Sequence, residues 1–191
     1  MSEKSGIPLA IDIFATADAA DEIVSVMHRA FAEYTAKGET SGAMLETPQT
    51  LREELAAGTR IAVMREHGEI IASVKHAPAG DGTLYFSRLA VDPAHRGHGV
   101  ARELVRALRA QAQAESLQGL SCTVRAGEAG NIALYEHLGM RITSQGTRVS
   151  RTGATLAVVT MRDGDGNSSV GATSLHGESA TVVRTAEVLG R

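Results

Sequence analysis

Apolar side chains along the chain follow a helical spacing in some segments and the shorter period of strands in others. Spacings of three and four, with capping residues and glycines at the ends, predict helices over 18–36, 48–58, 97–118 and 131–138. Runs rich in β-branched residues predict strands over 8–14, 60–65, 69–76, 83–91, 120–124, 141–149 and 155–162. The predicted order is β-αα-βββ-α-β-α-ββ, which indicates a mixed α/β fold.

Turn and helix lengths predict how these strands pair. The runs 60–65, 69–76 and 83–91 are joined by short glycine-containing turns, which is typical of an antiparallel meander. The strand 120–124 follows a long helix, so if it lies beside 83–91 the two run parallel through a crossover. Gly119 is expected to end that helix as its C-cap.

The length of 191 residues suits one domain, which we expect to span residues 1–162. The composition then shifts to Gly, Ser, Asp and Asn, which predicts a C-terminal tail over 163–191. Apolar residues return at 180–189, and such a patch has little reason to stay in water. Two alternatives stay open: a flexible tail, or a segment docked on its own domain or on a partner subunit.

Charge and cysteine content narrow the classes of partner. A net charge of −3 offers no basic field for many phosphates, so nucleic acid is not an expected partner. No stretch approaches the ~20 apolar residues that cross a bilayer, so neither secretion nor membrane insertion is expected. Cys122 is the single cysteine, which excludes an intrachain disulfide and favours a cytoplasmic location. His95 and His98 lack a third ligand at metal spacing, so no metal site is expected.

Residues 89–101 combine the end of a strand, a proline turn and a glycine pair that opens a helix. The first N–H groups of a helix lack partners within it and carry partial positive charge, so they bind phosphate. Gly97 and Gly99 let the backbone approach a ligand closely, and Arg96 adds a cation. The sequence therefore predicts a pyrophosphate-binding turn formed by Arg96, Gly97, His98, Gly99, Val100 and Ala101.

Two motifs together resemble a known family. The sequence RGHGVA at 96–101 resembles the Arg/Gln-x-x-Gly-x-Gly/Ala signature of GNAT-superfamily N-acetyltransferases, and NIALYEHLGM at 131–140 resembles their second element. Met140 departs from the family, which more often has Phe there. The match in element order extends from Ile11 to about Arg162. This resemblance implies a twisted, mostly antiparallel sheet that splays at the cofactor site, with helices on both faces.

By the same resemblance, the protein would be an enzyme that transfers the acetyl group of acetyl-CoA directly to an amine. Tyr135 would protonate the departing sulfur, the alternative being a packing role for its ring. Direct transfer needs no cysteine nucleophile, so Cys122 is expected to be a small buried core residue. The acetyl-CoA arm would contact the backbone of Leu89, Ala90 and Val91, and also Asn131.

The acceptor amine is expected on a small molecule. The alternatives are the N-terminus or a lysine of a protein or peptide, or a regulatory domain that binds acyl-CoA without catalysis. The family usually shapes its acceptor pocket with the helix and loop that here span 34–46, so Tyr34, Met44 and Glu46 are candidate contacts. No base is assigned, because Glu33, Glu46, His76 and the neighbours of Arg88 all lie on segments that could border the acceptor pocket, and spacing distinguishes none of them. The resemblance also admits a homodimer.

Overall fold

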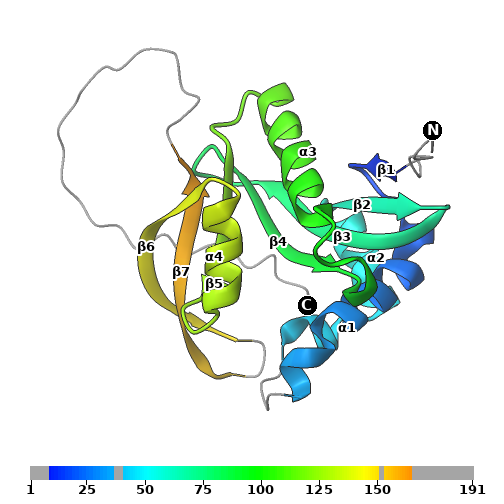
Figure 1. Ribbon diagram of the computed structural model, residues 1–191, viewed down its shortest axis with the longest axis horizontal. Helices are drawn as coiled ribbons and strands as arrows, with labels where there is room; N and C mark the ends of the chain where they lie inside the picture. Colours follow the sequence, from blue (N-terminus) through cyan, green and yellow to red (C-terminus); the bar gives the residue numbers. More distant parts are fainter. Residues whose placement is uncertain (1–8, 37–40, 151–152, 165–191) are drawn as a thin grey trace, which may run out of the picture.

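The structure is a computed structural model that describes residues 9–36, 41–150 and 153–164, with the side chains of 34–36 outside this description. Its order of helices and strands confirms the predicted one (Figure 1). Short 3-10 helices η1, η2 and η3 span Ala17–Ala19, Gly42–Leu45 and Pro93–His95. The α-helices are α1 (Ala20–Ala36), α2 (Pro48–Ala56), α3 (Val100–Ala114) and α4 (Ala129–His137). The strands are β1 (Leu9–Asp12), β2 (Arg60–Glu66), β3 (Glu69–Pro78), β4 (Leu84–Val91), β5 (Leu120–Arg125), β6 (Met140–Val149) and β7 (Thr155–Asp163).

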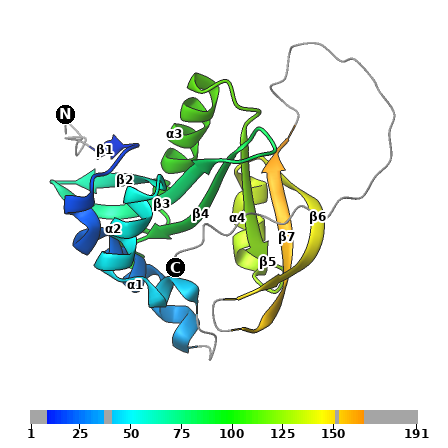
Figure 2. The same cartoon turned by 180° about the vertical axis from the view of Figure 1, so that it is seen from behind.

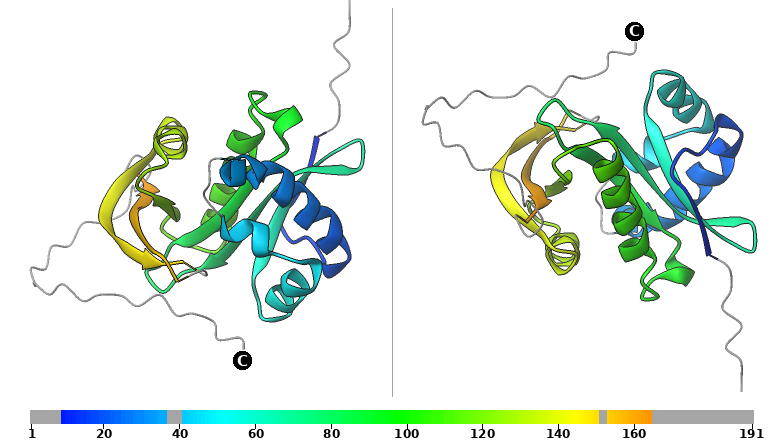
Figure 3. Two further views of the ribbon diagram at one scale, coloured as in Figure 1. Left: turned by 90° about the horizontal axis from the view of Figure 1, so that it is seen from below. Right: turned by 90° about the horizontal axis from the view of Figure 1, so that it is seen from above.

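Seven strands form one sheet in the order β1-β2-β3-β4-β5-β7-β6. Every neighbouring pair is antiparallel except β4 and β5, which run parallel as the crossover predicted. Helices α3 and α4 cover the face seen in Figure 1, and α1 and α2 cover the face seen from behind in Figure 2. Figure 3 shows the sheet as the middle layer between them. The predicted mixed fold with helices on both faces is therefore confirmed.

Each face of the sheet carries its own hydrophobic core. The core under α3 contains the residues predicted to face inward on that helix, and all of them are buried: Val100, Leu104, Val105, Leu108 and Ala112. The core under α1 and α2 gathers Ile23, Met27 and Leu51 against Ile61 and Val63 of β2. Replacing one of these fully buried Leu residues by Ala costs about 2–5 kcal/mol. These cores hold α1 and α3 on opposite faces of β4.

Helix α3 is shorter than the predicted 97–118 at both ends. It begins at Val100 because Gly99 is its N-cap in a left-handed conformation, with φ of 80°. It ends at Ala114, with Glu115 as its C-cap and Ser116 at a φ of 57°. The expectation that Gly119 caps this helix was wrong. The Gly119 carbonyl instead accepts a hydrogen bond from the Leu84 N–H, 2.9 Å away, where β5 joins β4.

Strands β4 and β5 are joined at one end, called here the closed end, and separate toward the other. Within the described residues they pair at two positions, Leu84 with Leu120 and Tyr85 with Ser121. The closed end is held by a 2.6 Å hydrogen bond between the hydroxyls of Thr83 and Ser121. Beyond this end the strands diverge (Figure 1). The sheet is therefore splayed in its middle, as the family resemblance implied.

Two further features complete the fold. The carboxylate of Asp163 accepts hydrogen bonds from the Arg109 guanidinium and from the Leu120 N–H, so Asp163 belongs to the folded unit rather than to the tail. The segment 180–189, which was predicted either to dock or to stay flexible, lies outside the described residues. None of the helices within 9–36, 41–150 and 153–164 is long and apolar enough to span a membrane.

Candidate active site

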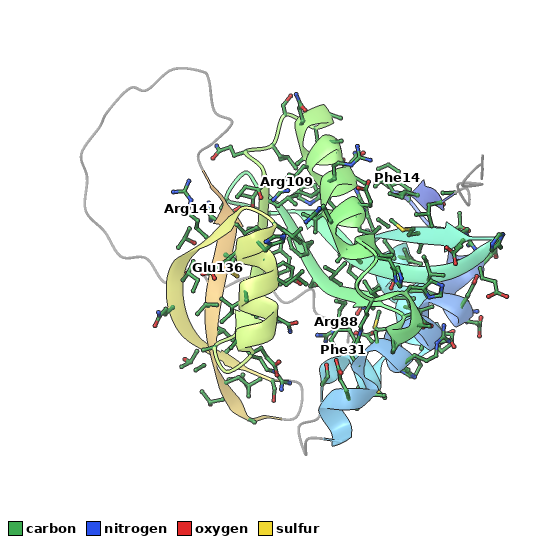
Figure 4. All side chains as sticks on the ribbon, viewed as in Figure 1. Phe14, Phe31, Arg88, Arg109, Glu136 and Arg141 are labelled. Carbon is green, nitrogen blue, oxygen red and sulfur yellow. The ribbon has the colours of Figure 1, made fainter. Side chains whose placement is uncertain are left out.

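A cavity of about 670 Å³ occupies the opening between β4 and β5. Its walls come from the C-terminal part of α1, from β4, from the turn before α3, from β5, from α4 and from β6. Figure 4 labels two of its residues, Phe31 on α1 and Arg88 on β4. The candidate residues from the sequence that line it are Leu89, Val91, Arg96, Gly97, Gly99, Ala101, Asn131 and Tyr135. Two motifs about 35 residues apart in sequence therefore meet at one cavity.

The turn before α3 has the geometry of an anion site. Gly97 and Gly99 take φ values of 78° and 80°, a region that favours glycine. A Cβ added at either glycine would meet no atom within 4 Å, so the space in front of the turn is open. The turn begins at Asp92, whose carboxylate accepts from the Ala94 N–H and from Arg29. The first N–H groups of the 15-residue α3 then open onto this space.

The carboxylate of Asp92 is kept charged by its partners. Partial burial acts to raise its pKa, but the Ala94 N–H and the Arg29 guanidinium outweigh that effect and hold the pKa below its ordinary value. The Arg29 Nε atom lies 2.7 Å from the carboxylate and ties the start of the turn to α1. The turn is thus fixed before any ligand arrives, which limits the entropy that binding would cost.

The Arg96 side chain points to α1 rather than into open space. Its guanidinium donates to the carboxylate of Glu33 at 3.0 Å and to the Ala30 carbonyl at 2.8 Å. Arg96 therefore anchors the second half of the turn to α1. The sequence analysis expected Arg96 to offer its charge to a phosphate, and in the structure that charge is paired with Glu33. Of the other predicted members, Ala101 lines the cavity, whereas the His98 side chain is exposed and the Val100 side chain is buried in the core under α3. These two residues have only backbone groups to offer to a phosphate.

The end of β4 presents backbone to the opening. Leu89 and Val91 line the cavity, while Ala90 points the other way and is buried in the core under α1. The pairing of β3 with β4 shifts between Ser73 and Lys75, and Arg88 at that point has a φ of 54°. This irregularity is a β-bulge, the feature whose position the sequence could not give. The bulge lies three residues beyond Tyr85, where the described pairing of β4 with β5 ends.

Helix α4 contributes Asn131 and Tyr135, which lie one turn apart on the side that faces the cavity. The ring of Tyr135 packs edge-on against Phe86 of β4, with ring centroids 5.5 Å apart and planes at 72°. Such a contact stabilises by roughly 0.5–1.5 kcal/mol beyond the area it buries. Tyr135 therefore both packs on the core and reaches the cavity, so both roles considered for it are compatible with its position.

The candidate acceptor contacts lie behind the cavity wall or outside the description. Met44 is half-buried in η2 and, like Glu46, is not among the described residues that line the cavity. Glu46 is 1% exposed. Its Oε1 atom lies 3.1 Å from Nζ of Lys75 and 3.7 Å from Nε of Arg88. A carboxylate so deeply buried needs such cations, so Glu46 is paired with Lys75 and Arg88 behind the cavity wall. Its contact with an acceptor stays a prediction. The side chain of Tyr34 lies outside the described residues.

Two titratable groups have the properties of core residues. Cys122 is buried, as expected, and burial together with the charge of Asp163 raises the pKa of its thiol to about 12. Although Cys122 touches the cavity, its thiol stays protonated at neutral pH. His76 is buried, and burial lowers the pKa of its ring. Its Nε2 atom lies 2.9 Å from the Ile13 carbonyl, and His76 is not among the described residues that line the cavity.

Several wall residues escaped the sequence analysis. They are Phe31 on α1, Ser41 at the start of η2, Tyr85 and Arg88 on β4, Thr123 and Arg125 on β5, and Arg148 on β6. Most of them sit in segments whose apolar pattern indicated ordinary strands or a helix. The one signal in the sequence was a basic residue near the end of each of two predicted strands, Arg125 and Arg148. This signal does not point to a shared site until the order of the strands in the sheet is known.

The fold and the family can now be compared with known proteins. Residues 24–140, more than half of the chain, match the model of the Acetyltransferase (GNAT) family. No curated protein matches the sequence. The ribosomal-protein-S18-alanine N-acetyltransferase from Escherichia coli is similar in structure, with a TM-score of 0.64, 20% identity, and coverage of 82% of this chain and 93% of that one.

Two other solved structures share the fold. The structure of yncA from Salmonella typhimurium, which contains its cofactor acetyl-CoA, has a TM-score of 0.61 at 19% identity and covers 84% of this chain and 96% of its own. An N-acetyltransferase from Staphylococcus aureus Mu50 has a TM-score of 0.63 at 18% identity, with coverages of 81% and 96%. The chain therefore belongs to the GNAT acetyltransferase family and is an acetyl-CoA-dependent N-acetyltransferase.

Proposed function

We propose that this enzyme transfers the acetyl group of acetyl-CoA directly to the amine of a small molecule. The observation that carries the proposal is the cavity between β4 and β5, which extends from the glycine turn before α3 along β4 to the wall of α1. Its volume of about 670 Å³ is in the range of pockets that hold small ligands. The family alone leaves the acceptor open, and the screen below distinguishes a small acceptor from a peptide.

Acetyl-CoA supplies an acetyl thioester and an anionic pyrophosphate. We propose that the N–H groups around Gly97 and Gly99 bind the pyrophosphate, because both glycines keep the space in front of them open. The backbone of β4 at Leu89 and Val91 would pair with the extended arm, as a strand edge pairs with an added strand. Asn131 would add a side-chain amide from the first turns of α4. In this proposal the donor is bound without a cationic side chain at the turn, because the guanidinium of Arg96 is hydrogen-bonded to α1.

In the proposed reaction, a neutral amine attacks the thioester carbonyl, a C–N bond forms and the C–S bond breaks. The amine loses one proton and the sulfur gains one. We assign the second proton to Tyr135, because it is a phenol on the wall of the cavity and is held in place by its contact with Phe86. Glu33 and Glu128 are the carboxylates among the described wall residues, and we assign no base between them.

A screen of acceptors tests this proposal. The enzyme would be mixed with acetyl-CoA and with small amines, peptides bearing free N-termini or peptides bearing lysine, and the release of free thiol would be followed. Release with small amines at rates well above hydrolysis supports the proposal. Release with peptides alone would point to a protein-modifying enzyme, and no release with any amine would favour a domain that binds acyl-CoA without transferring it.

We also propose that the enzyme acts in the cytoplasm and does not act on nucleic acid. The buried, protonated Cys122 and the net charge of −3 support these two points. A homodimer remains a prediction from the family resemblance. Sedimentation of the full chain would test the dimer, and a mass equal to one chain at micromolar concentration would contradict it.

A further inference from the structure

Helix α1 and the turn before α3 carry charged residues at the same spacing and in opposite order. On α1, Arg29 precedes Glu33 by four residues, so the two side chains lie one helical turn apart on one face. In the turn, Asp92 precedes Arg96 by four residues, with the 3-10 helix η3 between them. Figure 1 shows this segment, which joins β4 to α3, lying against α1. Each charge of α1 can therefore meet an opposite charge of the turn.

All four of these side chains are paired across the contact. The Nε atom of Arg29 donates to the carboxylate of Asp92 at 2.7 Å. The Arg96 guanidinium donates to the carboxylate of Glu33 at 3.0 Å and to the Ala30 carbonyl at 2.8 Å. The ion pairs Arg29 with Asp92 and Glu33 with Arg96, called here the α1 clamp, have opposite directions and lie on either side of η3.

The crossed order of the charges selects one position of the turn along α1. A shift of the turn by one helical turn in one direction would bring Arg96 to Arg29, and a shift in the other direction would bring Asp92 to Glu33. Both shifts place like charges together, which is unfavourable. A single ion pair would attach the turn without this selection. The α1 clamp therefore both attaches the turn and fixes its register on the helix.

A pyrophosphate site in the turn depends on this register. Arg96 comes directly before Gly97, and both Gly97 and Gly99 line the cavity with open space in front of them. Groups that bind a ligand must be held within about 0.5 Å of their productive positions. Glycine does not supply that order, because its backbone has the greatest conformational freedom. The neighbouring residues must supply it, which α3 does after Gly99 and the α1 clamp does before Gly97.

We propose that Arg29 and Glu33 of α1 are positioning residues for acetyl-CoA, which act through Asp92 and Arg96 on the N–H groups around the two glycines. This inference rests on the proposed function, in which those N–H groups bind the pyrophosphate. It gives Glu33, one of the candidate bases in the sequence, a role in holding the donor. It also makes Arg96 of the family signature a residue that orients the turn. Helix α1, which lies outside both sequence motifs, thereby becomes part of the donor site.

The affinity for CoA tests the α1 clamp without any acceptor. Calorimetry at a temperature well below Tm gives Kd for CoA and for acetyl-CoA, and a thermal melt gives the change in stability separately. Glu33→Gln keeps the shape of the side chain and removes its charge. It should raise Kd about two- to fivefold, because this ion pair is about half exposed. Arg29→Gln should raise Kd by about five- to tenfold, because the carboxylate that it leaves is only 15% exposed.

A double-mutant cycle separates a positioning role of Arg96 from direct contact with the phosphates. If Arg96 acts through its bond to Glu33, both Arg96→Gln and Glu33→Gln weaken the binding of CoA. The double variant should then bind about as weakly as Arg96→Gln alone, because the two changes remove the same interaction. A guanidinium that contacted the phosphates itself would be released by Glu33→Gln, and the affinity of that variant would stay the same or rise.

Glu22→Gln is the matched control. Glu22 is a carboxylate near the other end of α1, where it accepts from Arg65 at 3.2 Å and from the Ile70 N–H. Its side chain is 40% exposed, against 50% for Glu33, and it is not among the described residues of the cavity. This variant should lower Tm at least as much as Glu33→Gln does and should leave Kd for CoA unchanged.

The outcomes distinguish this inference from the proposed phosphate site. Weaker binding of CoA by Glu33→Gln and Arg29→Gln, with Glu22→Gln unchanged, supports the inference. If Glu33→Gln binds CoA as tightly as the wild type, or if Glu22→Gln loses as much affinity, the inference is overturned. A Gly99→Ala variant that binds CoA weakly would then show that the phosphate site stands without the α1 clamp. If Gly99→Ala binds CoA like the wild type, the phosphate site fails and the inference fails with it.

Discussion

Replacing Gly99 by alanine tests whether the turn before α3 binds the donor. Gly99 has a φ of 80°, and a Cβ there would meet no atom of the protein within 4 Å. A residue with a Cβ costs roughly 1–2 kcal/mol in the left-handed region. Loss of glycine also restricts the unfolded chain, which stabilises the folded state by about 0.4–1 kcal/mol. The net loss is on the order of 1 kcal/mol, equivalent to a fall in Tm of about 2–4 °C.

The affinity for acetyl-CoA should fall much more than the stability. The added methyl group occupies the space in front of the turn, so a pyrophosphate there would lose at least one charge-assisted hydrogen bond. Such a bond contributes about 1.5–3 kcal/mol, which corresponds to a rise in Kd of roughly 10- to 150-fold. Calorimetric titration with acetyl-CoA measures Kd, and a thermal melt measures Tm.

Gly58→Ala is the matched control. Gly58 follows α2, has a φ of 100° and likewise has no atom within 4 Å of an added Cβ, yet it is not among the described residues of the cavity. The Gly58→Ala variant should show a similar fall in Tm, of a few degrees, and should bind acetyl-CoA as tightly as the wild type does. If Gly99→Ala loses the same stability but binds acetyl-CoA like the wild type, the turn is not the phosphate site and the reasoning is refuted.

Three further changes probe single residues. Tyr135→Phe keeps the ring against Phe86, so kcat should fall by about 10²–10⁴ with little change in KM for acetyl-CoA, and wild-type turnover would assign Tyr135 to packing. The Cys122→Ala variant should retain the kcat of the wild type. Iodoacetamide should label the wild type slowly, because a thiol pKa of about 12 leaves about one thiolate in 10⁴ at pH 8. Rapid labelling of the wild type would contradict this expectation. The pKa of His76 is lowered by burial, so below pH 6.5 the unfolded chain binds more protons than the folded one. Urea melts should show the free energy of unfolding falling from pH 6.5 downward, and His76→Gln should flatten that dependence; an equal slope in both proteins would exclude His76 as its source.

The local sequence pattern predicted the order of helices and strands correctly, but it did not predict where α3 begins and ends. Leu104, Val105 and Leu108 recur at helical spacing, and that spacing alone identifies α3 and its buried face. The ends of α3 depend on backbone conformations that the pattern does not encode, a left-handed Gly99 before it and a left-handed Ser116 after it. The turn was predicted because all of its residues are neighbours in sequence.

The basic residues on the cavity wall could not be predicted, because they meet only through pairing between distant strands. Arg125 and Arg148 are 23 positions apart and become neighbours in space through β7, which comes later in the chain than either. Glu46 was expected at the acceptor, yet Lys75 and Arg88 converge on it from β3 and β4 and bury it. Such clusters depend on register, and register is a property of the whole sheet.

The opening between β4 and β5 divides the enzyme into two parts, and both of them line the cavity: Asn131 and Tyr135 of α4 lie on the side that follows the opening. The glycine turn and the bulge belong to the part that precedes the opening, while Arg125 and Arg148 belong to the part that follows it. The two parts share a short pairing at Leu84 and Tyr85 and a hydrogen bond between Thr83 and Ser121. The geometry of the cavity therefore depends on this short connection, because residues that we propose to bind the donor lie on both sides of it.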